Sequence, residues 1–124
     1  MSTWTTRELE AVGMATELEI ATRQPDGTLR PPVPIWVVRV GDDLYVRSYL
    51  GPASAWYRHA STHGSAQISA AGVERDVTVT VPDPATRPAI DAQYRFKYAA
   101  YPTHVPPMLA DTAADATLRL DPTD

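Results

Sequence analysis

Valine occupies positions 73, 77, 79 and 81, and polar side chains fill most of the positions between them. A period of two is typical of a β-strand with one buried and one exposed face. Gly72 precedes this run, and residues 67–71 ahead of it indicate another strand, so we expect an antiparallel hairpin. The strongest local pattern in the chain therefore favours an antiparallel sheet.

Four further strands are predicted from the same kind of pattern, over residues 17–22, 29–40, 44–49 and 116–120. Residues 24–27, with the sequence Gln-Pro-Asp-Gly, favour a tight turn, because proline presets φ and glycine accepts a positive φ. This turn should join the first two of these strands as a hairpin. Six strands are thus expected in all.

The strand predicted over residues 29–40 carries apolar side chains on both faces. Ile35 and Val37 fall on one face, and Trp36 and Val38 fall on the other. A strand of this kind is buried on both sides, so in a barrel its outward face must be covered by a helix or by a second subunit. Prolines at positions 31, 32 and 34 donate no ladder hydrogen bonds and indicate a sheet edge, a bulge or a close approach by another surface.

Helices are predicted in the gaps between the strands. The first spans residues 5–15, where Thr5 and Glu8 have the spacing of a capping box. The others span residues 54–63, which end before a glycine, and residues 87–100. Prolines at positions 102, 106 and 107 favour an extended connector before the last strand.

The order of these elements indicates a mainly β (α+β) fold, which is a small six-stranded antiparallel barrel or strongly curled sheet with short flanking helices. At 124 residues the chain fits a single domain, residues 1–124, of which residues 121–124 form a polar tail. The core of so small a chain is limited, so oligomerisation would help to stabilise it.

Composition and charge argue against several functions. Eleven basic residues against fifteen acidic ones give a net charge of −4, which disfavours nucleic acid as a partner. Cysteine is absent, so disulfides, thiolate metal sites and a cysteine nucleophile are excluded. The apolar runs fall far short of the ~20 residues that a membrane span needs, and charged side chains within residues 1–20 argue against a secretory signal. We therefore expect a cytoplasmic protein without a membrane partner.

One group of residues has the chemistry of an anion site, because arginine binds phosphate through paired hydrogen bonds and a helix N-terminus offers free backbone N–H groups. It gathers three arginines, a serine and a glycine at the end of the third strand, and the start of the next helix. Its members are Arg30, Arg47, Ser48, Gly51, Ser54, Trp56, Tyr57 and Arg58. The alternative is that the arginines are solvated and that Ser54 only caps its helix.

Aromatic residues form a second candidate set, because planar heteroaromatic ligands bind between aromatic and apolar walls. They are Trp36, Tyr45, Tyr49, Trp56, Tyr57, Tyr94, Tyr98 and Tyr101. The last three recur at helical spacing, so the alternative is that they pack the last helix against the sheet.

A metal site is a weaker hypothesis. His59 and His63 lie four residues apart on a predicted helix and would share a face. The residues between them lack the glutamate of the metalloprotease signature, and a third ligand such as His104 is only a guess. We therefore predict no metal.

Several segments together resemble the split β-barrel flavoproteins. They are residues 17–22, 27–30, 34–38, 44–51 and 55–60. Their order and spacing are similar to those of the deazaflavin-dependent nitroreductases, within the wider pyridoxamine-phosphate-oxidase-like superfamily, and to a bacterial family of unknown function in that superfamily. The resemblance implies a split β-barrel homodimer that binds FMN or deazaflavin at the subunit interface.

The resemblance also implies roles for individual residues. Arg30 matches an arginine that contacts the cofactor phosphate. Ser48 and Gly51 match the phosphate loop, and Trp56 and Tyr57 match the aromatic pair that opens the next helix.

Other residues are expected to complete the same site. Arg47 would add a second cation for the phosphate, and Pro34 and Trp36 would line the flavin ring. Tyr98 and Tyr101 fall where the nitroreductases place tyrosines near the substrate.

The sequence departs from the nitroreductase pattern at three places. Tyr49 stands where a lysine is usual, His59 stands where an asparagine is usual, and Pro25 and Asp26 replace a basic pair. These changes favour a cofactor with few negative charges, such as FMN. We predict a flavin- or deazaflavin-binding oxidoreductase that transfers hydride to or from a small molecule, without an assigned catalytic base. The alternative is a non-enzymatic split-barrel dimer that has lost the cofactor or binds a small ligand without turnover.

Overall fold

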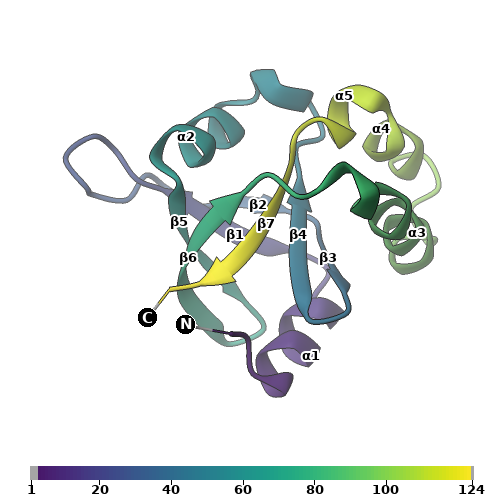
Figure 1. Ribbon diagram of the computed structural model, residues 1–124, viewed down its shortest axis with the longest axis horizontal. Coiled ribbons are helices and arrows are strands. Elements are labelled where there is room, and N and C mark those ends of the chain that lie inside the picture. The colour runs from purple at the N-terminus through teal and green to yellow at the C-terminus, as the bar shows by residue number, and fades with distance from the viewer. Residues whose placement is uncertain (1–2, 124) are drawn as a thin grey trace.

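The computed structural model describes residues 3–123, and within them seven strands form one sheet with short helices around it (Figure 1). In chain order the elements are α1 (Thr6–Met14), β1 (Leu18–Thr22), β2 (Val33–Ile35), β3 (Val37–Val40), β4 (Asp43–Arg47), the 3-10 helix η1 (Gly51–Ala53), α2 (Ala55–His63), β5 (Ser65–Ala70), β6 (Val73–Thr80), the 3-10 helix η2 (Pro84–Thr86), α3 (Arg87–Lys97), α4 (Val105–Leu109), α5 (Asp111–Ala114) and β7 (Thr117–Pro122). All neighbouring strands are antiparallel, in the order β2-β1-β5-β6-β7-β4-β3. The predicted mainly β class is confirmed.

The two edge strands of the sheet follow one another in the chain and are separated by Trp36 alone. β2 pairs with β1 and β3 pairs with β4, so the sheet curls into a nearly closed barrel whose edges meet at Trp36. The predicted number of six strands is therefore wrong, because the strand expected over residues 29–40 is two strands in the described chain. A straight strand would stay beside one neighbour, whereas the break at Trp36 lets the chain pass from one edge of the sheet to the other.

Two local sequence signals are confirmed in detail. Thr5 Oγ1 accepts a hydrogen bond from the Glu8 N–H at 3.0 Å, and Glu8 Oε1 accepts one from the Thr5 N–H at 3.0 Å, which completes the capping box of α1. Ala71 and Gly72 turn the β5–β6 hairpin with φ values of 50° and 83°. Positive φ at both central residues is the geometry that tight hairpins need.

The barrel interior holds the larger of two apolar clusters. Leu18, Val46 and Leu118 are among its fully buried members. Helix α1 adds Leu9 and Val12 and closes one end of the barrel (Figure 1).

The second cluster lies outside the barrel, between the β3–β4 hairpin and α3. Val38 and Tyr45 face Ile90, Tyr94 and Tyr98 there, and all five are buried. The strand segment with two apolar faces is therefore buried on both sides, as predicted, and its outward face is covered by a helix. Because α3 supplies this cover, the pattern does not by itself require a second subunit.

Side chains at the C-terminal end of α3 form hydrogen bonds with the backbone of β3 on its edge that faces no other described strand. The Tyr98 hydroxyl accepts a hydrogen bond from the Val37 N–H at 3.1 Å and donates one to the Thr16 carbonyl at 2.8 Å. Lys97 Nζ donates to the Val37 carbonyl at 2.6 Å. We refer to Thr16, Val37, Lys97 and Tyr98 as the seam, because side chains there join β3 to the start of β1 in place of a backbone ladder.

Two predictions near the C-terminus are wrong. The segment expected as an extended connector contains α4, and Pro106 and Pro107 lie in its first turn, where the missing N–H groups are not needed. The expected polar tail begins later, because β7 continues to Pro122, which pairs with Val77 of β6. Asp124 lies outside the described residues.

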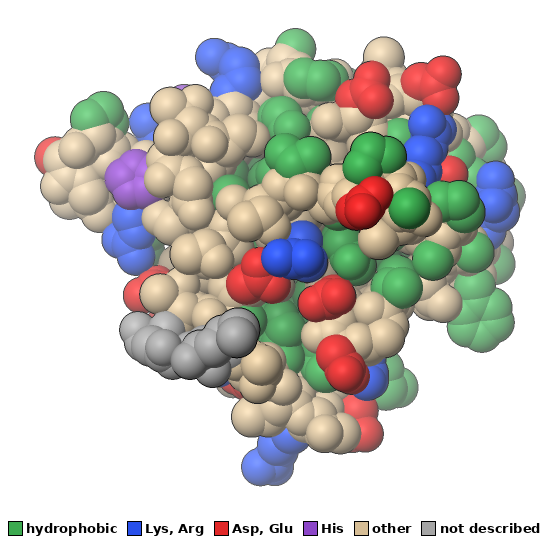
Figure 2. Space-filling view, viewed as in Figure 1, with side chains coloured by type: hydrophobic (Ala, Val, Ile, Leu, Met, Phe, Trp, Pro, Cys, Tyr) green, Lys and Arg blue, Asp and Glu red, His purple; other side chains and the backbone are tan. Residues whose placement is uncertain are grey.

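The face shown in Figure 2 carries basic and acidic side chains that are interspersed rather than gathered into one basic surface. Among residues 3–123, no helix has both the length and the apolar character that crossing a membrane would demand.

Candidate functional site

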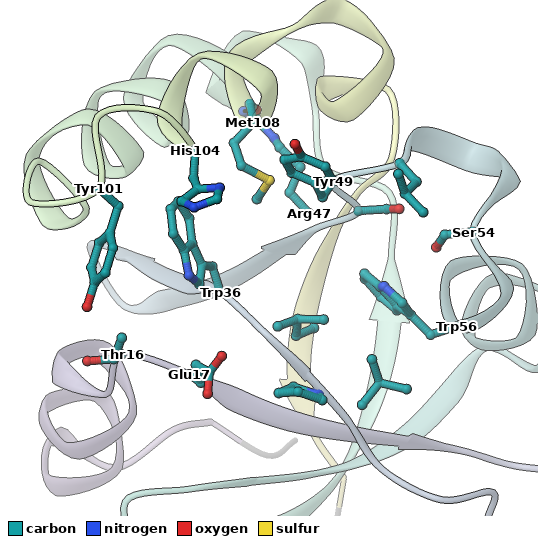
Figure 3. Close-up of a pocket in the computed structure, with 15 residues that line it drawn as sticks. Thr16, Glu17, Trp36, Arg47, Tyr49, Ser54, Trp56, Tyr101, His104 and Met108 are labelled. Atoms are coloured by element: carbon teal, nitrogen blue, oxygen red, sulfur yellow. Dashed lines mark hydrogen bonds between the residues drawn. The ribbon is translucent and has the colours of Figure 1, made fainter.

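A cleft of about 830 Å³ opens where the two edges of the sheet meet. Its walls come from the start of β1, from β2, from the end of β4 and from the starts of α2 and α4 (Figure 3). Small-molecule sites typically have ~300–1,000 Å³ and a mostly apolar lining with a few polar groups. The cleft therefore has the size and composition of a ligand site.

One end of the cleft is aromatic. Trp36 stacks on Tyr98, with the two rings nearly parallel and their centroids 3.8 Å apart. Tyr101 lies 5.8 Å from Trp36 at an angle of 50°, and the His104 ring stands nearly perpendicular to it at 6.5 Å. Tyr98 fills one side of Trp36, so only the other side of the indole is available to a ligand. Figure 3 shows Trp36, Tyr101 and His104 at this end of the cleft.

The other end of the cleft presents hydroxyl groups beside the start of α2. Ser48 is completely buried, and its Oγ has no hydrogen-bond partner among the described residues. Ser54 Oγ is likewise unpartnered within residues 3–123 and does not cap α2, which argues against the alternative that Ser54 serves only as a helix cap. Trp56 lines the same end (Figure 3). An unpaired buried hydroxyl is costly, so a bound molecule, either water or a ligand, would have to supply the missing partners.

Arg47 lines the cleft, but its guanidinium is occupied. It forms an ion pair with Asp91 at 2.7 Å and donates to the Thr117 hydroxyl at 2.8 Å and to the Met108 carbonyl at 2.9 Å. The group also lies over the Tyr94 ring, 5.1 Å from its centroid, and the residue is 2% exposed. Arg47 therefore fixes β4 to α3, α4 and β7, and its charge is largely balanced within the protein.

Three of the predicted cofactor residues lie outside the cleft lining. Arg30 belongs to the β1–β2 hairpin, which projects from the barrel in Figure 1, and its Nη1 donates to the Arg23 carbonyl at 2.6 Å. Tyr57 packs against the barrel core. Gly51 has a φ of +79°, and a Cβ there would lie 3.2 Å from the Thr112 carbonyl oxygen, so this position shapes the backbone between β4 and α2.

The two tyrosines that were expected near the substrate lie in different environments. Tyr101 lines the cleft as predicted from its position, whereas Tyr98 lies behind Trp36 with its hydroxyl in the seam. Burial strongly raises the pKa of the Tyr98 hydroxyl. Tyr94 and Tyr98 therefore pack α3 against the sheet, as the alternative expected. Pro34, Trp36 and Tyr101 line the cleft.

Sequence reasoning missed several lining residues. Glu17 and Thr16 lie just ahead of β1, and Met108 belongs to α4, in a segment where no helix is predicted. His104 lines the cleft although the sequence suggested it only as a metal ligand. Glu17 is the first residue of the strand predicted over residues 17–22, and this position could have marked it, because binding residues often lie where a strand meets a loop.

The histidines of α2 do not form part of a metal-binding group. Among the described residues, no three His, Asp or Glu side chains lie together as metal ligands would. His59 has its pKa lowered by burial and by the charges of Arg30 and Arg58.

Solved structures with the same fold include proteins that bind flavin-type cofactors. The similar structures include a candidate pyridoxamine 5′-phosphate oxidase from Listeria innocua (TM-score 0.65, 9% identity, 95% of this chain and 92% of that one). They also include an FAD-binding protein from Mesorhizobium loti (TM-score 0.60, 14% identity, 98% and 92%) and an F420 reductase (TM-score 0.54, 18% identity, 94% and 93%). The predicted resemblance to split β-barrel proteins is thus confirmed for the fold.

Comparison of the sequence, rather than of the fold, finds a match to one protein family. None of the curated proteins matches it significantly. The model of a family described as "Uncharacterized protein conserved in bacteria (DUF2255)" matches residues 8–120, and the chain therefore belongs to this bacterial family.

Proposed function

We propose that this protein binds a flavin-type cofactor, FMN, FAD or deazaflavin, in the cleft and acts as an oxidoreductase on a small molecule. The observation that carries the proposal is the pair of unpartnered hydroxyls, Ser48 and Ser54, at one end of an aromatic cleft of about 830 Å³. The same fold in an FAD-binding protein and in an F420 reductase supports it. When bound, such a cofactor supplies the hydride chemistry.

The ring of the cofactor fits the apolar part of the cleft. Trp36 offers one free face, and Tyr98 stacked behind it holds the indole in place. Trp56 and Met108 add apolar surface on other walls. These residues would orient a planar ring and exclude water from it.

The phosphate of the cofactor fits the hydroxyl end. The first-turn N–H groups of α2 carry the positive end of the helix dipole, and no described side chain caps them. Ser48 and Ser54 would add two hydrogen-bond donors. This end suits one phosphate held by neutral donors, because Arg47 is balanced by Asp91.

We further propose that the protein acts as a homodimer. Val33, Tyr49 and Leu50 at the cleft mouth are 38%, 51% and 73% exposed, which is unusual for large apolar side chains so close together. Arg30 lies outside the cleft of its own subunit, so a second copy is the place where it could meet a cofactor phosphate. Light scattering that shows only monomer at tens of micromolar would reject this part of the proposal.

A titration tests the cofactor directly. The purified protein is titrated with FMN, FAD and F420 while the absorption and fluorescence of the cofactor are followed. We expect at least one to bind, and we expect Ser48→Ala to weaken it about tenfold, because a hydrogen bond to a charged group is worth ~1.5–3 kcal/mol. Ser61→Ala, at an exposed position of α2, is the matched control and should bind like the unmodified protein.

A second candidate function is a non-enzymatic split-barrel module that binds a small ligand without turnover. The balanced charge of Arg47 and the position of Arg30 outside the cleft favour it. The same titration separates the two: no spectral change with any of the three cofactors at about 100 μM would reject the oxidoreductase and leave the module.

A further inference from the structure

The charges of the cleft are unequally distributed between its two ends. Glu17 lies exposed at the aromatic end, and no other described residue forms an ion pair or hydrogen bond with its carboxylate. Arg47, the one arginine among the described lining residues, is paired with Asp91 at 2.7 Å. Lys97 donates to the Val37 carbonyl in the seam and does not line the cleft. Among the described residues that line the aromatic end, the Glu17 carboxylate is therefore a charge that no partner balances.

The rings around this carboxylate are inclined to one another. Tyr101 and His104 meet Trp36 at angles of 50° and 86°, with centroid distances of 5.8 and 6.5 Å. In Figure 3 the Glu17 carboxylate points into the cleft from the start of β1, on the same side of the cleft as Trp36 and Tyr101. This end of the cleft therefore combines a carboxylate with aromatic rings of different orientation.

We propose that the aromatic end of the cleft binds an organic cation, namely an amine or quaternary ammonium group on a small-molecule substrate. The faces of Trp36 and Tyr101 attract a cation through their quadrupoles, and the Glu17 carboxylate supplies the opposite charge. An anionic group would be repelled by Glu17, and a neutral one would gain only apolar contact.

This site is separate from the one proposed for the cofactor phosphate. The hydroxyl end comprises Ser48, Ser54 and the start of α2, and none of these residues belongs to the aromatic end. The cation site shares Trp36 with the ring proposed above, so it is tested on cofactor-free protein, in which no flavin competes for the free face of the indole.

Binding of choline is compared with binding of its neutral isostere 3,3-dimethyl-1-butanol, using the chemical shifts of the tryptophan indole protons at about pH 7.5, where histidine is ordinarily neutral. We expect choline to bind with a dissociation constant in the millimolar range and at least about fivefold more tightly than the alcohol, as a ~1 kcal/mol ion pair and cation–π contacts imply. Equal affinity for the two probes would overturn the proposal, as would no binding of choline at about 100 mM.

Two variants and one control locate the site. Glu17→Gln should weaken choline about fivefold and leave the affinity for the alcohol unchanged. Tyr101→Leu should weaken choline two- to threefold, because it keeps an apolar wall without the ring. Glu19→Gln, two residues along on an exposed position of β1 and outside the cleft, should bind like the unmodified protein. Unchanged choline binding in Glu17→Gln would overturn the assignment, whatever the outcome of the flavin titration.

Discussion

The two edges of the sheet meet at Trp36, yet they are built differently. On the β3 side, side chains of α3 pair the backbone of Val37, and Arg47 and Tyr94 are buried behind it. On the β2 side, Val33 and Pro34 are exposed and line the cleft. One edge is closed by packed side chains, and the other is left open as the wall of a cavity.

The closed edge therefore contributes to the stability of the fold, whereas the open edge contributes to ligand binding. Because side chains rather than a backbone ladder close the barrel, the gap that remains beside Trp36 can hold a ligand without any loss of sheet hydrogen bonds. Substitutions on the β3 side should therefore change the free energy of unfolding, whereas substitutions on the cleft side should change ligand affinity.

The largest effect is expected from Arg47→Ala, which tests whether this arginine belongs to the closed side. Its removal takes the closer of two ion-pair partners from the largely buried Asp91 carboxylate, which keeps Arg87 at 3.4 Å, and it leaves the Met108 carbonyl without the guanidinium. The free energy of unfolding should fall by about 3–5 kcal/mol, measured by urea denaturation. Arg95→Ala, at an exposed position of α3, should change it by less than about 0.5 kcal/mol. A loss of unfolding free energy below about 1 kcal/mol for Arg47→Ala would contradict this assignment and would favour a role for Arg47 in ligand binding.

A pair of tyrosine variants tests the seam. Tyr98→Phe removes the hydroxyl that joins Val37 to Thr16 and should cost about 1–3 kcal/mol, because the Val37 N–H loses its partner. Tyr94→Phe is the control, since the Tyr94 hydroxyl is buried without a partner among the described residues. Its free energy of unfolding should stay the same or rise. Equal losses for the two variants would show that the seam hydrogen bonds contribute nothing specific.

Lys97 makes the closed side sensitive to pH. Burial lowers its pKa to about 8 in the folded protein, against about 10.4 when unfolded. The unfolded chain then binds more protons between these values, so the free energy of unfolding should rise from pH 8 to 10, by about 1 kcal/mol after allowance for solvent screening. Above pH 10 the trend should reverse, because burial raises the pKa of Tyr94 and Tyr98.

Denaturation curves between pH 6 and 11 measure this effect. Lys97 is the only lysine in the sequence, so Lys97→Met should abolish the rise between pH 8 and 10 and leave the fall above pH 10. A rise that persists in Lys97→Met would assign it to another group.

The smallest effect on stability is expected on the open side. Ser48→Ala removes a buried hydroxyl that has no partner among residues 3–123, so the free energy of unfolding should change by less than about 1 kcal/mol and in the stabilising direction. The same variant should lose cofactor affinity. A clear destabilisation would place Ser48 with the closed side.

Local signals in the sequence were sufficient for most of the elements. The alternation around Val77 and Val79 predicts β6, and the capping residues Thr5 and Glu8 predict the start of α1, because each depends on neighbours within a few positions. The break at Trp36 was not predicted, since nothing local distinguishes one long strand from two short strands at opposite edges of a sheet.

The candidate site was predicted only in part, for the same reason. Trp36, Trp56 and Ser48, which the sequence suggested as cofactor residues, line the cleft. Arg47 was expected to be free, but its partner Asp91 lies 44 positions further along the chain. Glu17 and Met108 were missed, because they reach the cleft from segments that lie far in the sequence from Ser48 and Trp56.

By itself, therefore, the sequence determined most of the strands, the starts of α1, α2 and α3, and several of the aromatic and hydroxyl groups that line the cleft. The tertiary structure alone decided which charges remain available, because an ion pair depends on two side chains being brought within about 4 Å. The packing of α3 against the β3–β4 hairpin brought Asp91 to Arg47, whereas Glu17 has no described partner, and this set which charges the cleft presents.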